Sequence, residues 1–355
     1  MRKYLILAIL ALVMVLVVAC SSGDKDTGGS TDDSATNEST DAGDATKSEE
    51  AGDWVPEESI EIVAPAGAGG GWDTTARMSA QVLSEEGIID QSIGVVNKEG
   101  GGGAVGWAYI SGFEGNPYKL FVSSPPLIFI PLNGQSEYDH NDFTPLANVI
   151  ADYAAFAVKD DAKWEDLNDL FEDMKEDPES ITVVGTSSPG SMDHIQFVQI
   201  AKAAGVDITK IKYVSAQDSA GLTQLLNGSV DVYSTGVAET VEQVKAGNIR
   251  VLGVTSEERL EGEVLEDFPT VIEQGIDETF VNWRGFFGPP NMEPAAVAYY
   301  EQKFKELSDS EAFAEIRAKF GWNEMYMDSA EYIQFLDEQR ESTQELLDEL
   351  GISEQ

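Results

Sequence analysis

The sequence predicts an α/β fold of two lobes with mostly parallel sheets. After residue 53, short β-rich runs alternate with helical patterns, which is typical of βαβ units. About 300 residues follow that point, too many for one simple core but suited to two lobes. Two apolar runs, near residues 155–159 and 282–288, are expected to cross between the sheets. We therefore expect lobe 1 to comprise residues 54–157 and 284–355, and lobe 2 to comprise residues 158–283.

Hydrophobic periodicity gives the individual elements. The expected strands are residues 59–64, 93–97, 119–123, 147–158, 181–185, 211–214, 230–233 and 250–255. The expected helices between them are residues 74–85, 105–111, 164–175, 192–204, 220–226 and 238–246. In the tail, two long amphipathic helices, 294–319 and 329–350, flank a short turn and a possible strand. Helices of this kind usually bury one face against a lobe from outside.

The first 19 residues have the pattern of a targeting signal. Arg2 and Lys3 precede an uninterrupted apolar run over residues 4–19, which we exclude from the fold. The run ends at Ala19 and Cys20, and this junction resembles the lipobox of bacterial lipoproteins, so we expect Cys20 to be lipidated. The alternative is an uncleaved transmembrane anchor, because the run is nearly long enough to span a bilayer. Both interpretations place the rest of the chain outside the membrane.

Residues 20–53 are predicted to be a lipidated, disordered tether. After Cys20 the segment consists almost wholly of Ser, Thr, Gly, Asp, Glu, Asn and Ala. Such a segment cannot bury enough apolar surface to offset the entropy lost on ordering.

Composition excludes several classes of function. The chain has 22 Lys and Arg residues against 64 Asp and Glu residues, a net charge of −42, which disfavours binding to nucleic acid. We attribute this acidity to solubility rather than to a cationic partner. Cys20 is the only cysteine, so no disulfide forms within the chain. His140 and His194 are the only histidines, and without a spaced Cys/His set we expect no metal and no cofactor.

The most informative segment is residues 62–73, where a strand enters a glycine-rich turn and then a helix. Glycines allow positive φ and close approach, and free N–H groups at a helix start attract an anion. The Lys and Ser/Thr that close a nucleotide P-loop are missing. The candidate ligand residues here are Ala68, Gly69, Gly70, Gly71, Trp72 and Asp73.

Three of these residues carry more specific expectations. At Gly70 we expect positive φ or close approach. Trp72 is either a lid over the solute or simple packing. Asp73 is interpreted as the helix N-cap in preference to a ligand contact.

A second strand-to-helix junction, residues 184–194, again places small hydroxyl residues and glycines at a helix start. Its candidates, Ser187, Ser188, Ser191 and Asp193, are expected to hold the other end of the same anion. The competing hypothesis is a secreted hydrolase that uses Ser188 or Ser191 with His194. Their crowding on one helical turn argues against a catalytic triad, whose members converge from different elements.

Other strand ends add small polar residues. A glycine run at residues 100–103 follows a strand and opens a helix, and Ser124, Ser219 and Thr235 also follow strands. Open α/β sheets bind ligands at the carboxyl ends of their strands. Arg284, at a predicted crossing, either assists anion binding or forms a salt bridge there.

Taken together, these segments resemble the solute-binding proteins of tripartite tricarboxylate transporters. The resemblance extends from about Ile60 to the C-terminus. It is carried by residues 69–77, 96–98 with 104–106, 213–219, 225–232, 244–256, 267–271 and 282–285.

The resemblance implies a two-lobed periplasmic-binding-protein-like fold of type II, a "Venus flytrap", without catalytic activity. It implies that loops 68–73 and 187–193 hold one carboxylate of the solute, partly through water, with Ser124, Ser219 and Thr235 nearby. The solute would be a tricarboxylate or dicarboxylate, delivered to transporter membrane subunits by a monomer anchored to the outer face of the membrane. Departures from the family pattern at Ala66 and Ala68 leave the identity of the solute open. A sensory binding module of the same fold is the remaining alternative.

Overall fold

The computed structural model describes residues 54–216 and 220–353. The predictions for the signal peptide, Cys20, the tether and Ser219 lie outside the described residues. Within them, every helix is too short or too polar to span a bilayer.

A first sheet forms around the N-terminal strands. Its members are β1 (Ile60–Ala64), β2 (Ile93–Asn97), β3 (Lys119–Ser123), β4 (Thr144–Lys159), β9 (Val281–Gly288) and β10 (Asn323–Met327). β1 pairs in parallel with β2 and β3, as the sequence predicts, because helices connect these strands. β3 pairs antiparallel with β9.

A second sheet continues from the far half of β4. Its other members are β5 (Thr182–Gly185), β6 (Lys212–Ser215), β7 (Val232–Gly236) and β8 (Ile249–Val254). β5 pairs in parallel with β6 and β7, whereas β4 pairs antiparallel with β7 and β8.

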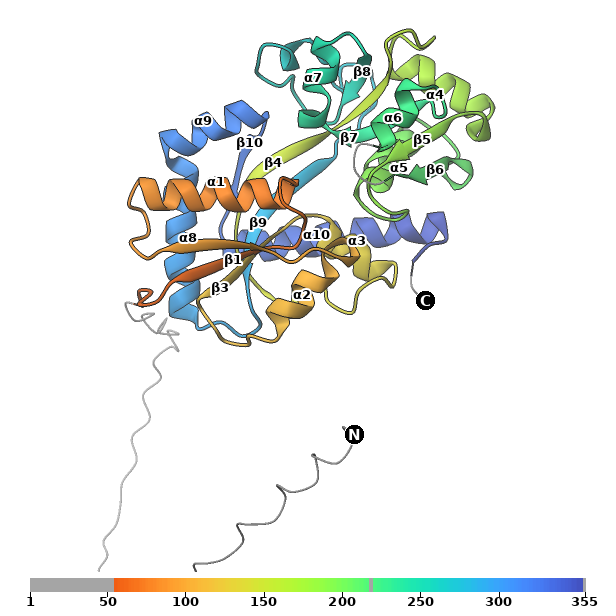
Figure 1. Ribbon diagram of the computed structural model, residues 1–355. Coiled ribbons are helices and arrows are strands. Elements are labelled where there is room, and N and C mark those ends of the chain that lie inside the picture. Colours follow the sequence, from red (N-terminus) through yellow and green to blue (C-terminus); the bar gives the residue numbers. More distant parts are fainter. Residues whose placement is uncertain (1–53, 217–219, 354–355) are drawn as a thin grey trace, which may run out of the picture. The chain divides into compact units, whose positions relative to one another are not determined.

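Two long strands link the sheets (Figure 1). β4 has 16 residues and belongs to both sheets, and β9 pairs antiparallel with its first half, from Thr144 to Tyr153. One strand leaves the first sheet and the other returns to it, so they must run in opposite directions. The parallel prediction therefore holds among β1, β2 and β3 and among β5, β6 and β7. β8 and β10 pair antiparallel with β4, so the sheet as a whole is mixed.

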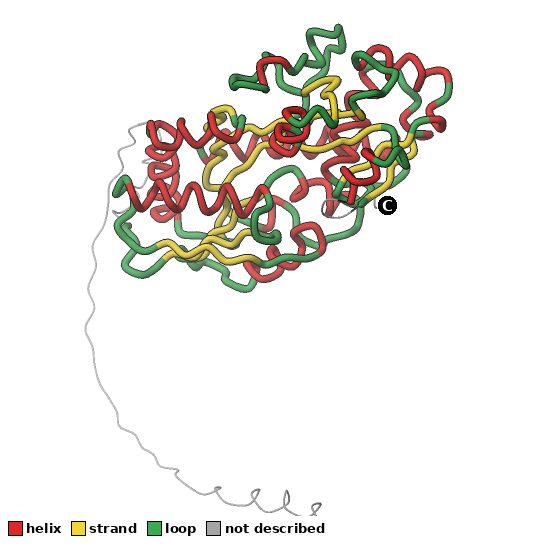
Figure 2. The backbone as a smooth tube through the Cα atoms, turned by 45° about the horizontal axis from the view of Figure 1, so that its top comes forward, coloured by secondary structure: helices red, strands yellow, loops and turns green. Residues whose placement is uncertain are grey.

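Helices surround both sheets (Figure 2). The α-helices are α1 (Gly71–Glu85), α2 (Ala104–Ser111), α3 (Pro126–Leu132), α4 (Leu167–Glu176), α5 (Met192–Ala203), α6 (Ala220–Leu226), α7 (Val241–Lys245), α8 (Pro294–Asp309), α9 (Glu311–Phe320) and α10 (Ser329–Leu350). Short 3-10 turns are η1 (Gly101–Gly103), η2 (His140–Asp142), η3 (Pro178–Ser180), η4 (Ile208–Lys210), η5 (Val237–Glu239) and η6 (Leu265–Asp267). The sequence did not predict α3, because its apolar run contains Pro131 and lacks a polar face.

The C-terminal helices α8 and α10 pack on opposite faces of β9. Successive strand residues point to opposite sides, so Phe286 and Phe287 enter different cores. Phe286 stacks on Phe304 of α8 with ring centroids 4.3 Å apart, and Phe287 contacts Tyr332 of α10 at 5.2 Å. The tail helices thus fix the returning strand from both sides.

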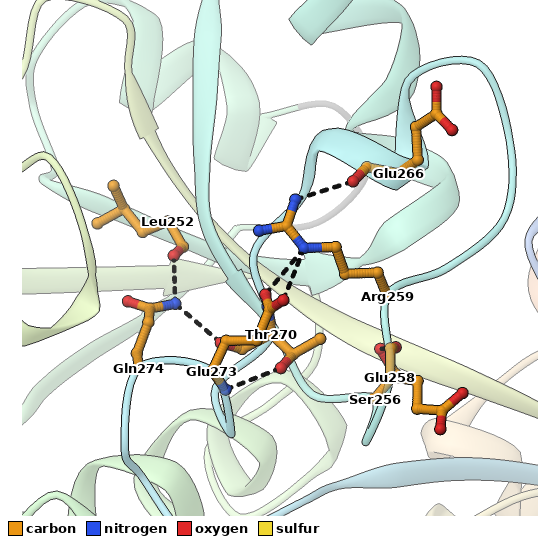
Figure 3. A network of polar contacts seen from close by, with 8 residues as sticks. All are labelled: Leu252, Ser256, Glu258, Arg259, Glu266, Thr270, Glu273 and Gln274. Carbon is orange, nitrogen blue, oxygen red and sulfur yellow. Dashed lines mark hydrogen bonds and ion pairs between the residues drawn. The ribbon is translucent and has the colours of Figure 1, made fainter.

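Side-chain hydrogen bonds hold most of the segment between β8 and β9 (Figure 3). Arg259 Nε donates to both carboxylate oxygens of Glu273 at 2.8 and 2.9 Å, and its Nη1 donates to the Glu266 carbonyl at 2.9 Å. Gln274 Nε2 donates to the carbonyl oxygens of Leu252 and Thr270. The Arg259 hydrogen bond lowers the pKa of Glu273. None of these residues lines the cleft described below, so we assign the network a structural role.

Candidate functional site

A cleft with a volume of about 510 Å³ opens between the two sheets. Its walls come from the loops after β1, β2 and β3 on one side and from those after β5 and β7 on the other. Asp152 of β4 and Asn282 and Arg284 of β9 line it where the crossing strands pass. The carboxyl ends of the parallel strands therefore meet at one site, as the sequence predicts.

In the first loop, Asp73 is not the N-cap of α1. The N-cap is Gly70, and Asp73 is the third helical residue. Asp73 Oδ2 accepts the Gly69 N–H at 2.8 Å, and Oδ1 accepts from Arg77 Nε at 2.9 Å and from Asn97 Nδ2 at 2.8 Å. Burial opposes ionisation, but the hydrogen bonds from Arg77, Gly69 and Asn97 lower the pKa of Asp73. Asp73 does not line the cleft, so its carboxylate holds the loop in shape.

The glycines of this loop have different roles. Positive φ occurs at Gly69 (83°), whereas Gly70 has φ −72°, so the expectation of positive φ at Gly70 is wrong. The close approach occurs at Gly71, where an added Cβ would lie 2.6 Å from Arg284 Nη2. Gly71 and Trp72 line the cleft, and Ala68, Gly69 and Gly70 do not. Within the described residues, the N–H groups of Gly71 and Trp72 have no acceptor.

Trp72 packs against Trp107 and also lines the cleft. Its indole Nε1 donates to Ser124 Oγ at 2.9 Å, and its ring lies 6.3 Å from that of Trp107. Ser124 is buried and also lines the cleft. The hydrogen bond fixes the position of the indole beside the start of α1.

The second loop is built in the same way as the first. α5 begins at Met192 after the N-cap Ser191, and Asp193 stands in its first turn. Asp193 Oδ2 accepts from the Thr186 N–H at 2.7 Å and the Ser187 N–H at 3.0 Å, and Ser187 Oγ accepts the Asp193 N–H at 2.7 Å. Each junction therefore uses an aspartate of its own helix to hold the preceding loop. The Met192 N–H has no acceptor in the described part of the chain.

The remaining sequence candidates divide between the cleft and its surroundings. Ser187, Ser191, Asp193 and Thr235 line the cleft. Ser188 does not line the cleft. Its Oγ donates to Gln135 Oε1 at 3.4 Å.

His194 supports its own junction. Its Nδ1 accepts the Gly190 N–H at 3.0 Å, and burial lowers the pKa of His194 to about 4. The His194 N–H donates to the Ser191 carbonyl at 3.1 Å, but across residues 54–216 and 220–353 no hydrogen bond joins the His194 imidazole to the hydroxyl of Ser188 or Ser191. This arrangement is not that of a serine hydrolase.

The charged residues of the cleft were largely missed by sequence reasoning. Arg284 Nη2 donates to Asp152 Oδ2 at 2.6 Å, and both side chains are buried, so the salt bridge foreseen for Arg284 is present. Glu99 and Glu239 also line the cleft. Asp152 gave a signal, because it is the only acidic residue in an otherwise largely apolar strand. Glu239, in a mixed polar segment, gave none.

Comparison with known proteins supports a binding function. The family model described as "Tripartite tricarboxylate transporter family receptor" matches residues 75–352. A UPF0065 protein of Cupriavidus necator is 26% identical over 304 residues, covering 84% of this chain and 89% of the relative.

Solved structures agree with this match. A TctC solute binding protein from Polaromonas has a TM-score of 0.67 and 25% identity, covering 83% of this chain and 99% of that one. A Rhodopseudomonas palustris protein solved with adipate has a TM-score of 0.72 and 21% identity, covering 84% and 99%. MatC from the same species, solved with malate, has a TM-score of 0.67 and 18% identity, covering 82% and 99%. The two-lobed binding-protein fold is thereby confirmed.

Proposed function

The chain belongs to the tripartite tricarboxylate transporter receptor family, and from that premise we propose that it captures a small carboxylate for the membrane subunits of such a transporter. It is a solute-binding protein and not an enzyme. The proposal concerns the class of solute, the site that holds it and the attachment of the protein to the membrane.

One observation supports the carboxylate most strongly. The helix starts at Gly71 and Met192 belong to different loops, line the same cleft and keep N–H groups without an acceptor among the described residues. Such groups carry a partial positive charge and point at a bound anion. We assign the carboxylate of the solute to the space between these two helix starts.

The chemistry of similar proteins is consistent with this site. The two Rhodopseudomonas palustris structures hold malate and adipate, which are both dicarboxylates. Of our candidates, Gly71, Trp72, Ser124, Ser187, Ser191, Asp193 and Thr235 line the cleft and remain proposed ligand or wall residues.

The membrane attachment is also a proposal. Residues 1–19 would be removed as a signal peptide, Cys20 would carry the lipid, and residues 20–53 would serve as the tether to a monomeric receptor. The lobe boundaries 157/158 and 283/284 would fall within or beside the crossing strands β4 and β9.

A thermal-shift screen over organic acids tests the solute class. A true ligand at one hundred times its dissociation constant should stabilise the fold by about 2.7 kcal/mol. If no carboxylate compound stabilises the protein, the proposed function is wrong.

Gly71→Ala tests the position of the carboxylate. Its Cβ would displace the Arg284 guanidinium beside the first turn of α1, so we expect at least a tenfold loss of affinity, about 1.4 kcal/mol, by calorimetric titration. Gly70→Ala is the matched control, because its Cβ would approach the Gly67 carbonyl oxygen at 3.3 Å and Gly70 does not line the cleft. Equal affinity in both variants, with folded circular dichroism spectra, would remove the carboxylate from this helix start.

A further inference from the structure

The side chains that line the cleft form an acidic wall. Four are carboxylates (Glu99, Asp152, Asp193 and Glu239), and Arg284 is the only cation among the described lining residues. Arg284 is already paired with Asp152, so its charge is offset within the protein. A carboxylate solute must therefore depend on the N–H groups at the starts of α1 and α5. A hydrogen bond needs a donor–acceptor distance of about 2.9 Å, so the position of the loops before these helices decides the affinity.

Gly190 is the residue at which the second loop is held from outside. It is buried and stands two residues before Met192, the first residue of α5, whose N–H has no acceptor in the described part of the chain. The Gly190 N–H donates to His194 Nδ1 at 3.0 Å, within the same junction. The Gly190 carbonyl oxygen accepts from Asn133 Nδ2 at 2.9 Å, 57 residues earlier in the chain. The position of the loop therefore depends on Asn133.

Asn133 belongs to the opposite side of the cleft. It ends α3, which follows β3 of the first sheet, whereas the loop at Gly190 follows β5 of the second. Among the described residues, its Oδ1 is buried without a hydrogen-bond partner, so the bond to Gly190 is the one that its side chain makes. Asn133 does not line the cleft. It can act on a solute only through the loop that it holds.

A second contact between the same two segments is weaker. Ser188 Oγ donates to Gln135 Oε1 at 3.4 Å, and both residues are exposed. Water competes for such a bond, whereas the Gly190 carbonyl is buried. The Asn133 bond is therefore the main polar link between α3 and the loop.

The C-terminal segment packs on the same glycine. Gly190 has a φ of 79°, and an added Cβ there would lie 2.8 Å from Asn133 Nδ2 and 3.2 Å from Ile352 Cδ1. Ile352 follows α10, which contacts α3 and η4 (Figure 1). Glu349 of α10 also forms an ion pair with Lys202 of α5. Asn133 and Ile352 thus enclose the space that a side chain at residue 190 would occupy.

We propose that Asn133 is a positioning residue for solute capture: together with Ile352 it holds Gly190, and through Gly190 it keeps the Met192 N–H at the cleft. This inference rests on the proposed function, which places the carboxylate between the starts of α1 and α5. Without the Asn133 bond, the loop can move away while the solute is bound, so the solute leaves faster. Its entry is unchanged, because Asn133 does not line the cleft.

Hydrogen exchange of the full-length protein tests the loop without any solute. Asn133→Ala removes the donor and leaves the sequence of the loop unchanged. Loss of one hydrogen bond should raise amide exchange in the peptide covering residues 187–194 by about threefold to tenfold. Unchanged exchange in this peptide would show that the loop is held without Asn133 and would overturn the inference.

Asn248→Ala is the matched control. Asn248 also follows a short helix, is exposed, does not line the cleft, and its Nδ2 donates to Gln243 Oε1 within its own segment at 2.9 Å. This variant should leave exchange in residues 187–194 within about twofold of the original value.

Stopped-flow fluorescence tests the effect on the solute, because Trp72 lines the cleft and supplies a signal. The probe is whichever of succinate, malate, adipate and citrate the original protein binds most tightly. Asn133→Ala should raise the dissociation rate constant by about threefold to tenfold and leave the association rate constant within about twofold. A residue that served only the fold would lower the free energy of unfolding in urea and leave both rate constants unchanged.

A double-mutant cycle tests the part played by Ile352. Ile352→Ala should also raise the dissociation rate constant. Because both side chains act on Gly190, the two effects should combine to less than the product of the single ones. If the factors multiply to within about twofold, Ile352 acts independently and its assignment is overturned.

The outcomes separate the inference from the function on which it rests. If no acid of the thermal-shift screen binds, the proposed function fails, and hydrogen exchange still shows whether Asn133 holds the loop. If the acids bind but Asn133→Ala changes neither rate constant, carboxylate binding stands and the positioning role is wrong. If only the association rate constant falls, Asn133 acts on entry, and the inference is likewise overturned.

Discussion

At the scale of single residues, Asp73 and Asp193 show that a polar residue at a binding loop need not contact the solute through its charge. Each carboxylate accepts N–H groups of the loop before its helix and so keeps that loop in one conformation. The N–H groups of the first helical residues, Gly71 and Met192, are left without an acceptor among the described residues. The aspartates therefore shape the anion site by satisfying some donors and leaving others free.

His194 leads to a prediction about pH. Burial lowers its pKa from 6.5 to about 4, so the folded state disfavours its protonation. The stability that depends on neutral His194 is complete above pH 6.5 and is lost as the pH falls towards 4. Between pH 7 and 4.5 this loss amounts to about 2 kcal/mol. His194→Asn can still accept the Gly190 N–H through its side-chain oxygen. The free energy of unfolding of this variant, measured with urea, should therefore fall by less between these pH values than that of the original protein.

The original protein, measured in parallel, is the reference for this comparison, because the carboxylates titrate equally in both proteins. The same pH dependence in both would mean that His194 is not held neutral by burial.

At the scale of elements, the C-terminal tail differs from the single helix expected over residues 294–319. α8 ends at Asp309, Ser310 has extended φ/ψ of −72° and 141°, and α9 starts at Glu311. Ser310 Oγ accepts the Phe313 N–H at 3.2 Å, which is an N-cap bond. Hydrophobic periodicity continues across the break, so the apolar pattern alone does not reveal it. The capping serine was the available signal.

Ser310→Ala should therefore destabilise the fold by about 1 kcal/mol, because the start of α9 loses its cap. Chemical denaturation measures this difference. Ser342→Ala, an exposed site within α10, should change stability by less than about 0.5 kcal/mol. Equal effects at the two serines would show that the cap contributes nothing.

At the scale of the whole molecule, the proposed solute site and the proposed membrane anchor lie in separate segments. The cleft is built wholly from residues between Pro65 and Arg284, whereas the proposed anchor is Cys20. We therefore expect a change at the proposed anchor to leave the geometry of the cleft unchanged.

Cys20→Ser should thus move the protein into the aqueous phase in detergent partitioning, because serine offers no thiol for the lipid. Its affinity for the best acid of the screen should not change. Ser30→Ala in the tether is the control and should remain in the detergent phase. Retention of Cys20→Ser in detergent would identify residues 4–19 as an uncleaved anchor.

The sequence by itself determined the order of the elements, the strand-to-helix junctions and the family. These features are written in contiguous residues: β-branched runs, helical periodicity and glycines before helix starts. The helix start at Met192 and the expected strand at 147–158 were therefore recognisable without coordinates, whereas α1 begins at Gly71, three residues before the expected start. The short helix α3 was missed because an apolar run with an internal proline has no helical pattern to detect.

Only the tertiary structure decided which polar groups remain available to a solute. Asp152 and Arg284 are 132 residues apart in the chain and meet because β4 and β9 run side by side. The same pairing brings Asn282 opposite Asp152, and the β4–β7 register places Glu239 near them. The charge of the cleft depends on these distant contacts, and local patterns contain no information about them. That is why the sequence predicted where an anion would bind but not the acidic wall facing it.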